Sequence, residues 1–261
     1  MLDALSADAR LLDAPPGPLR VHSAFERSAN LLTGDGRLVA VTARTFDDAP
    51  WSIRADLERF PTLTAGATGC LDADRLRLPG LTLRVSGARP WRPAPLAPFT
   101  GAGRLGALVE ELGRRGGALP SPGEKGPVEQ AVADRLAEGI AALRQDLDLA
   151  VRLLAGTGTG LTPAGDDVLA GFGLAAAIPA SPVHPMRDRL AAAYRDLRGR
   201  TALLSLVTMN EAVQGRARQR ILDVADALPF PGRLEAAVAR AVEIGHTSGT
   251  DLLCGLVAGL G

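Results

Sequence analysis

The spacing of the hydrophobic residues changes at a proline-dense stretch, residues 89–98, and this change limits the possible folds more than any other feature. Before it, residues 37–42 and 76–85 alternate apolar and polar side chains, which is typical of strands. After it, apolar residues recur every three or four positions, which is typical of helices. The sequence therefore predicts an α+β protein, with a β-rich N-terminal domain over residues 1–100 and a mainly α-helical C-terminal domain over residues 101–261.

The longest helical pattern runs from Val128 to Leu154 and predicts one long helix with a single apolar face. The proline-dense stretch predicts an extended connector rather than a central strand, because proline has no backbone N–H to donate. Residues 113–127 have the composition of a flexible loop, and residues 21–31 predict a single strand. Further helices are predicted over residues 186–197, 203–213, 221–228 and 234–244, with a last helix from Asp251.

A short phrase occurs twice in the C-terminal part, as Gly-Asp-Asp-Val-Leu-Ala-Gly at residues 165–171 and as Gly-Thr-Asp-Leu-Leu-Cys-Gly at residues 249–255. Each copy follows a turn rich in Gly and Thr and places a carboxylate, Asp167 or Asp251, at the start of an apolar helical run. Helix starts gather free backbone N–H groups and the positive end of the helix dipole. We therefore predict that the two helix starts face each other across one polar pocket.

The segment before the first copy, residues 156–163, reads Gly-Thr-Gly-Thr-Gly-Leu-Thr-Pro. Its glycines permit positive φ angles, and Thr162 followed by Pro163 has the pattern of a helix N-cap and first helical residue, so we predict an anion-binding loop. No Lys-Ser/Thr pair follows, as a P-loop requires, and Pro163 replaces the third glycine of a dinucleotide fingerprint. No nucleotide or organic cofactor is therefore predicted. The alternative is that the glycines only turn the chain and admit close helix contact.

The neighbouring acids Asp166 and Asp167 point in different directions on a helix, so one would cap the helix and the other would face the pocket. The second copy has Thr250 in place of Asp166 but keeps Asp251, which favours Asp167 as the pocket residue. If Asp167 and Asp251 converge, a cation, a shared proton or a bound cationic group must relieve their repulsion. Carboxylate and hydroxyl oxygens suit Mg²⁺, with Asp166, Asp167 and Asp251 as predicted ligands. The alternative is that both acids only bind backbone amides.

One of the three histidines, His246, lies directly before the second copy. A histidine there would polarise a carbonyl group or move a proton, so we predict a catalytic role for it together with Asp167 and Asp251. A capping or packing role is the alternative. Thr201, Ser205 and Thr208 share one helix face, which would line the pocket or pack closely. The predicted anion- and substrate-binding residues are Gly158, Thr159, Gly160, Thr162, Gly165, Ser205, Thr247, Ser248 and Gly249.

Composition argues against several classes of protein. The 29 acidic and 29 basic residues leave no net charge to attract nucleic acid or an anionic membrane. Cys70 and Cys254 are too far apart in sequence for a metal-ligand spacing and form no disulfide framework, which indicates a reducing compartment. The longest apolar run, residues 168–180, is too short to span a bilayer, and the N-terminus lacks the apolar region of a signal peptide. We expect a cytoplasmic protein that binds neither nucleic acid nor membrane.

Residues 158–171 and 244–253 resemble the AllH-type subunit family of oxamate carbamoyltransferase, many members of which were long known only as a domain of unknown function. Residues 22–31 and 201–215 also resemble segments of that family. The resemblance implies one subunit of an enzyme that moves a carbamoyl group between oxalurate and phosphate, giving oxamate and carbamoyl phosphate, in anaerobic allantoin breakdown. It implies a small anionic substrate, such as a phosphate, carboxylate or carbamoyl compound, and other subunits as partners.

Three hypotheses of different classes remain open at this point. The chain is a subunit that takes part in carbamoyl or acyl-phosphate transfer, a non-catalytic subunit that binds a small anion or serves as a scaffold, or a protein in which the repeat is purely architectural. Asn in place of Asp167 and Asp251 separates the first two, because only a catalytic role predicts loss of turnover with ligand binding retained.

Overall fold

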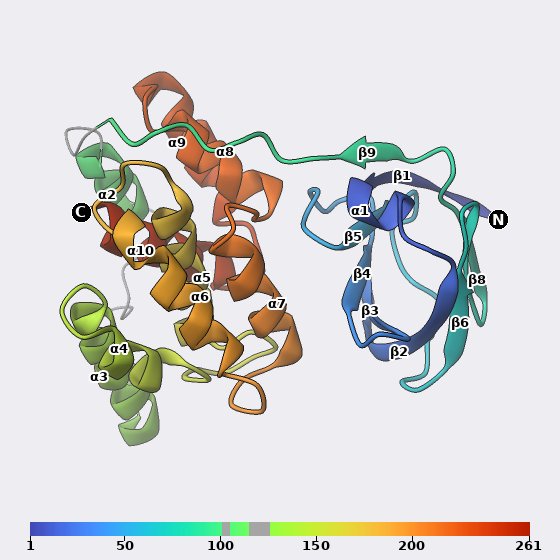
Figure 1. The fold of residues 1–261 in the computed structure, drawn as a ribbon, viewed down its shortest axis with the longest axis horizontal. Coiled ribbons are helices and arrows are strands. Elements are labelled where there is room, and N and C mark those ends of the chain that lie inside the picture. The colour runs from blue at the N-terminus through green and yellow to red at the C-terminus, as the bar shows by residue number, and fades with distance from the viewer. Residues whose placement is uncertain (101–104, 115–125) are drawn as a thin grey trace. The chain divides into compact units, whose positions relative to one another are not determined.

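We describe a computed structural model of the chain, in which residues 1–100, 105–114 and 126–261 are described. The predicted flexible loop therefore lies largely outside the described residues. Contacts divide the chain into two units, Met1–Ala94 and Pro95–Gly261. The first is built from strands and the second from helices (Figure 1), so the α+β fold class is confirmed. None of the described helices is both long and apolar enough to cross a membrane.

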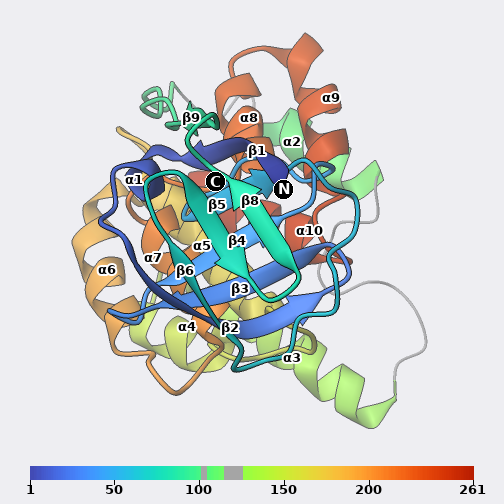
Figure 2. The same ribbon diagram turned by 90° about the vertical axis from the view of Figure 1, so that its right-hand side faces the viewer.

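The N-terminal unit is a curved sheet that closes on itself. Its strands are hydrogen-bonded in the order β5-β4-β3-β2-β6-β7-β8-β1-β9, and β5 also pairs with β1, which closes a barrel (Figure 2). Side chains that point inward, such as Val21, Leu31 and Leu83, are fully buried in one apolar core. The elements are β1 (Leu2–Asp8), α1 (Ala9–Leu12), β2 (Gly17–Phe25), β3 (Ser28–Thr33), β4 (Leu38–Thr42), β5 (Ser52–Ala55), β6 (Thr68–Leu71), β7 (Arg75–Leu78), β8 (Leu81–Arg84) and β9 (Arg89–Trp91).

Two strand predictions are confirmed and two need correction. Strand β4 occupies most of the alternating segment 37–42. The alternating segment 76–85 contains most of β7 and β8, which pair as a hairpin that turns at Pro79 and Gly80, where a φ of +74° suits glycine. The single strand expected over residues 21–31 is instead the β2–β3 hairpin, in which Phe25 pairs with Ser28. The proline-dense connector begins with a short edge strand, β9, which tolerates Pro90 because few of its N–H groups are needed for pairing.

The second unit contains α2 to α10. The shorter helical patterns are confirmed within a few residues at each end. The last helix, predicted to start at Asp251, begins slightly earlier, at Ser248. The elements are α2 (Leu105–Arg114), α3 (Pro127–Ala142), α4 (Leu147–Leu154), α5 (Ala164–Ala177), η2 (His184–Met186), α6 (Arg187–Arg195), α7 (Leu203–Ala212), α8 (Gln219–Ala227), α9 (Pro231–Ala241) and α10 (Ser248–Leu260).

The long helix expected from Val128 to Leu154 is wrong, because two helices, α3 and α4, occupy that segment. The chain turns after Ala142, and the Asp146 side chain caps α4 by accepting a hydrogen bond from the Leu149 N–H at 3.0 Å. The two helices then pack on each other, so closely at Gly139 that a Cβ there would lie 2.7 Å from Leu154 Cγ. The apolar period continues across the turn because both helices bury their leucines.

Helices α5 and α10, which carry the two copies of the repeated phrase, form the centre of the helical unit. Almost every residue of α5 is buried, including both of its acids. Gly171 and Gly255 occupy equivalent places in the two copies, and each packs against the backbone of the other helix. A Cβ at Gly171 would lie 2.8 Å from the Leu252 carbonyl carbon, and one at Gly255 would lie 2.8 Å from that of Val168. The two copies therefore pack with approximate two-fold symmetry.

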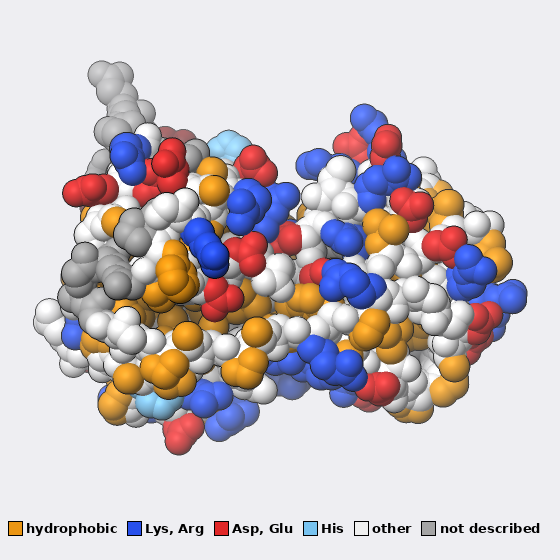
Figure 3. Space-filling model, turned by 90° about the horizontal axis from the view of Figure 1, so that it is seen from above, with side chains coloured by type: hydrophobic (Ala, Val, Ile, Leu, Met, Phe, Trp, Pro, Cys, Tyr) orange, Lys and Arg blue, Asp and Glu red, His pale blue; other side chains and the backbone are white. Residues whose placement is uncertain are grey.

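Figure 3 shows acidic and basic side chains intermixed on the visible face of both units, without a large area of one sign. Most of the exposed ionic contacts join an arginine to a nearby acid, as between Arg189 and Asp148 at 2.8 Å. Exposed ion pairs of this kind stabilise a fold little. This surface is consistent with the balanced charge of the sequence.

Candidate functional site

The starts of α5 and α10 come together at their first turns. The hydroxyl oxygens of Thr162, just before α5, and Ser248, the first residue of α10, are 3.0 Å apart. Asp167 and Asp251 are each the fourth residue of their helix, at equivalent places in the two copies. The repeat therefore brings two carboxylates, two hydroxyl groups and two positive helix ends to one place. The first turns of both helices are buried at the acids but only partly buried at the hydroxyl groups.

Glycines at the second position of each helix make this approach possible. A Cβ at Gly165 would lie 2.8 Å from the carbonyl carbon of Leu154, the last residue of α4. At Gly249 the equivalent contact is 2.9 Å from the carbonyl carbon of Ala241, the last residue of α9. Each copy thus presses its helix start onto the end of the preceding helix. These two glycines, predicted as substrate-binding residues, are buried at helix contacts.

Asp167 lies in the buried centre of this cluster, with 3% of its surface exposed. Its Oδ2 accepts a hydrogen bond from the Thr162 hydroxyl at 3.1 Å. Burial raises the pKa of Asp167 to about 7, against the lowering effect of the Ser248 and Thr162 hydroxyl groups, and the charges of Asp251 and Asp166 raise it further. This carboxyl group therefore changes its protonation state near neutral pH.

Asp251 is the least satisfied acid of the site. Only 1% of its surface is exposed, and neither carboxylate oxygen has a hydrogen-bond partner among the described residues. Burial raises its pKa to about 6, although the nearby Thr247 hydroxyl lowers it. A buried carboxylate without a donor is rare in folded proteins, so Asp251 is suited to bind a proton, an ion or a ligand group.

Asp166 is committed to holding the loop before α5. Its Oδ1 accepts a hydrogen bond from the Gly156 N–H at 2.8 Å, and its Oδ2 accepts one from the Thr201 hydroxyl. Both oxygens thus serve the local fold, as expected for the acid without a counterpart in the second copy. Thr201 lies before α7, so it does not share a helix face with Ser205 and Thr208, which corrects the predicted stripe.

The other members of that stripe differ in their contacts. Ser205 is buried on α7, and its hydroxyl has no hydrogen-bond partner among the described residues. Thr208 donates its hydroxyl to the Leu204 carbonyl at 3.0 Å, which is an ordinary contact within a helix. The Ser205 hydroxyl, unlike that of Thr208, is therefore left to bind a ligand group.

The glycine-rich loop presents a run of unbonded N–H groups. Gly156, Gly158 and Gly160 have φ angles of +72°, +121° and +105°, which side-chain-bearing residues rarely adopt. No hydrogen bond joins the N–H groups of residues 158–162 to any described residue. The prediction that Thr162 is the N-cap of α5 is wrong. Pro163 holds that position, and the Thr162 hydroxyl donates to Asp167 instead. Thr159 is exposed in this loop.

One contact of the glycine-rich loop could not be predicted from the sequence. The Arg135 guanidinium, on α3, donates from Nε to the Thr157 hydroxyl at 3.0 Å and from Nη2 to the Arg152 carbonyl at 2.7 Å. These bonds tie the start of the loop to α3 and α4. The chain has many arginines on helix faces, and nothing in their spacing distinguishes this one.

His246 and Thr247 are exposed in the turn between α9 and α10. No hydrogen bond of His246 to another described residue is present. The Thr247 carbonyl accepts the Asp251 N–H at 2.9 Å, so this turn fixes the start of α10. The catalytic role of His246 stays a prediction.

Two of the three acids of the site, Asp167 and Asp251, have carboxylate oxygens left for a metal. The described residues contain no group of three or more His, Cys, Asp or Glu side chains that would hold an ion. Because Asp166 is engaged with Gly156 and Thr201, Asp167 and Asp251 remain as possible ligands. Two carboxylates beside hydroxyl groups are hard oxygen donors of the kind that Mg²⁺ accepts, provided that a substrate or water supplies further oxygens.

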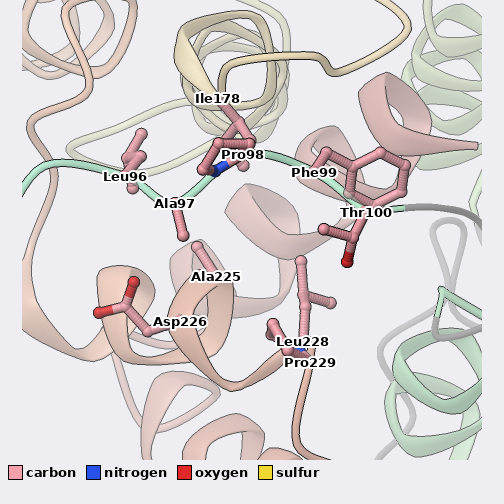
Figure 4. A pocket seen from close by; sticks show the side chains of 10 residues that line it. All are labelled: Leu96, Ala97, Pro98, Phe99, Thr100, Ile178, Ala225, Asp226, Leu228 and Pro229. Carbon is pink, nitrogen blue, oxygen red and sulfur yellow. The ribbon is translucent and has the colours of Figure 1, made fainter.

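A cavity elsewhere in the helical unit does not match the predicted site (Figure 4). It has a volume of about 20 Å³, room for roughly one water molecule, and lies between the connector and α8. Asp226 is the acid at its edge, and burial beside Asp223 raises its pKa. The lining residues are Leu96, Ala97, Pro98, Phe99, Thr100, Ile178, Ala225, Asp226, Leu228 and Pro229.

Comparison with known families agrees with the repeated phrase. Residues 154–260 match the family described as oxamate carbamoyltransferase subunit AllH, and residues 3–90 match the AllH family N-terminal domain. No solved structure matches the chain. The first match includes both converging helices, and the two matches together cover most of the sequence. The chain therefore belongs to the AllH family of oxamate carbamoyltransferase subunits.

Proposed function

We propose that the converging starts of α5 and α10 form the substrate site through which this subunit takes part in carbamoyl transfer. In the proposed reaction, oxalurate and phosphate give oxamate and carbamoyl phosphate, as a step of allantoin-type nitrogen catabolism in the cytoplasm. The observation that carries the proposal is the buried, unpartnered carboxylate of Asp251 beside Asp167 and next to a loop of free N–H groups. Family membership supports a role as one subunit of such an enzyme.

The two halves of the site would divide the work of binding. The N–H groups of residues 158–162 and the positive ends of two helices suit a phosphate or carboxylate. The Thr162 hydroxyl donates to Asp167 and lies 3.0 Å from the Ser248 hydroxyl, so these two hydroxyl groups would orient the transferred group. His246, exposed at the start of α10, would act on the substrate only from the solvent side.

We propose Asp167 and Asp251, and not Asp166, as the residues that would hold a Mg²⁺ ion. The ion would neutralise charge on phosphate and so favour transfer. Its presence is tested by the thermal unfolding temperature of the full chain with and without Mg²⁺, in wild type and in Asp167→Asn. A rise with Mg²⁺ in wild type that disappears in the variant supports the site, and equal behaviour of both proteins removes Mg²⁺ from it.

The test of the function itself is ligand-dependent thermal stability. Phosphate, carbamoyl phosphate, oxamate and oxalurate are each added to the full chain, because a ligand that binds only the folded state must raise its unfolding temperature. We expect a rise with carbamoyl phosphate or oxalurate that is lost in Gly158→Ala, whose added Cβ would lie 2.6 Å from the Ala164 nitrogen. Gly232→Ala is the matched control, since its Cβ would meet open space. No rise with any of the four compounds would remove the site.

A non-catalytic, anion-binding subunit is the second candidate function. The observation in its favour is that His246, the predicted proton carrier, is exposed and contacts neither acid through a hydrogen bond. Asp167→Asn and Asp251→Asn in the assembled enzyme distinguish the two functions. Loss of turnover with ligand binding retained favours catalysis, and full turnover favours the binding subunit.

A further inference from the structure

The unpartnered oxygens of Asp251 restrict what the site accepts. Both oxygens are buried and accept no hydrogen bond from a described residue. Asp167 beside them receives one from Thr162, which leaves acceptor capacity on that carboxyl group as well. Among the described residues, no arginine or lysine forms a hydrogen bond or ion pair with Asp167 or Asp251. The deep part of the site is therefore rich in carboxylate acceptors, and the donors near it are hydroxyl groups rather than cationic side chains.

Without a bound cation, an anionic group is the wrong partner for this part of the site. A fully ionised phosphate or carboxylate group offers no proton to a carboxylate, and like charges placed together disfavour binding. An amide or ureido nitrogen carries N–H groups and no negative charge. Hydrogen bonds from such N–H groups to a buried carboxylate are charge-assisted and therefore strong. The chemistry of Asp251 selects this kind of ligand group.

The glycine-rich loop provides the opposite chemistry close by. Residues 158–162 present N–H groups without acceptors, and Thr162 links this loop to both Asp167 and Ser248. The loop is exposed at residues 159–161, so it offers an anion a binding surface that is open to solvent. A ligand with an anionic end and an N–H end would satisfy both parts at once.

We propose that Asp251 and Asp167 accept hydrogen bonds from the carbamoyl or amide N–H groups of the substrate, while residues 158–162 bind its anionic end. The inference rests on the proposed function and assigns an orientation within that site. It makes the acid pair a determinant of specificity for the NH₂ group. Since the oxygens of Asp251 are closed to solvent, the ligand would enter past the exposed glycine loop.

Oxamate and pyruvate provide a matched test, because they have the same shape and charge and differ by NH₂ against CH₃. Their dissociation constants for the full chain are measured by calorimetry in EDTA, which removes any metal. We expect oxamate to bind at least about tenfold more tightly, because a site built for hydrogen bonding rejects an analogue that lacks the donor. Equal affinities, or no binding of oxamate, would overturn the inference.

Variants of Asp251 test whether this residue causes the preference for oxamate over pyruvate. Asp251→Leu replaces both oxygens by methyl groups and keeps the branching at Cγ, so the ratio of the two dissociation constants should fall toward one. Asp251→Asn, which changes the shape least, should lower the ratio while the circular dichroism spectrum stays unchanged. Asp196→Asn, at an exposed acid after α6, is the control and should keep the wild-type ratio. An unchanged ratio in both Asp251 variants also overturns the inference.

The two proposals fail differently. If phosphate and carbamoyl phosphate stabilise the chain while oxamate and pyruvate bind alike, the anion site stands and the orientation is wrong. If none of the proposed ligands binds, the proposed function itself fails. Carbamoyl phosphate and acetyl phosphate, which also differ by NH₂ against CH₃, repeat the comparison on a phosphate ligand and should show the same preference.

Discussion

Asp251→Asn should make the protein more stable at neutral pH, which is an unusual expectation for a buried polar residue. The pKa of Asp251 is about 6 in the fold against an ordinary value of 3.8. Each pH unit between these values corresponds to about 1.4 kcal/mol, so ionisation costs the folded state on the order of 3 kcal/mol at pH 7. An amide does not ionise, but it keeps part of the burial cost. We therefore expect a net gain of roughly 1–2 kcal/mol.

The pH dependence has a definite sign. A carboxyl group whose pKa is raised by folding binds its proton more tightly in the folded than in the unfolded state. Its contribution is fully present below about pH 4 and is lost as pH rises through the folded pKa, near 6 for Asp251 and near 7 for Asp167. Wild-type unfolding free energy should therefore fall between about pH 4 and pH 7, and the fall should be smaller in the variant.

Urea unfolding of the full chain at several pH values measures both effects. Circular dichroism at 222 nm follows the helical unit, and tryptophan fluorescence follows the N-terminal unit, which contains both Trp51 and Trp91. Asp196→Asn, at an exposed acid after α6, is the control and should change neither stability nor slope. A loss of stability in Asp251→Asn at neutral pH, or a wild-type stability that rises between pH 4 and 7, would refute the reasoning.

Three further perturbations test other contacts. Gly171→Ala forces a methyl group against the backbone of α10, so it should lower the free energy of unfolding measured in urea by about 1–3 kcal/mol. Gly232→Ala, whose added methyl group meets open space, is the control and should leave that free energy unchanged. Tyr194→Phe removes a 2.6 Å hydrogen bond to a backbone carbonyl of α5 and should lower the free energy of unfolding by about 1–3 kcal/mol in the same assay. An unchanged urea midpoint would contradict this prediction. Thr201→Val removes one donor from Asp166, and hydrogen exchange should then show faster exchange of the loop amide that Asp166 anchors.

The helices and strands that could be predicted are those in which the apolar residues keep one regular spacing over the whole element. Alternation identified β4 and the β7–β8 hairpin, and the helical period identified most helices of the second unit. The break between α3 and α4 was missed because the turn after Ala142 preserves the spacing of the buried leucines. Asp146 was the available signal, since aspartate is a preferred N-cap.

The AllH family membership predicted from the repeated phrase is confirmed by the family matches. Comparison of the two copies also separated Asp166 from Asp167, because only one of them has an acidic counterpart. The hydroxyl contacts were not predictable, since Thr162 reads as a helix cap in the sequence and its turn toward Asp167 depends on α10 lying beside α5. Contacts between elements distant in sequence leave no local pattern. The roles of these residues in binding and catalysis stay predictions.

The reciprocal glycine contacts limit how the helical unit can move. Backbones that touch at Gly171 and Gly255 leave no gap through which α5 and α10 could slide past each other. The pair should therefore behave as one rigid body, and ligand-driven rearrangement should be confined to the chain that leads into each helix. Glycines with positive φ precede the first turn of each helix, at Gly158 and Gly245 among others. The two acids would then stay at a fixed separation while the loops beside them change shape.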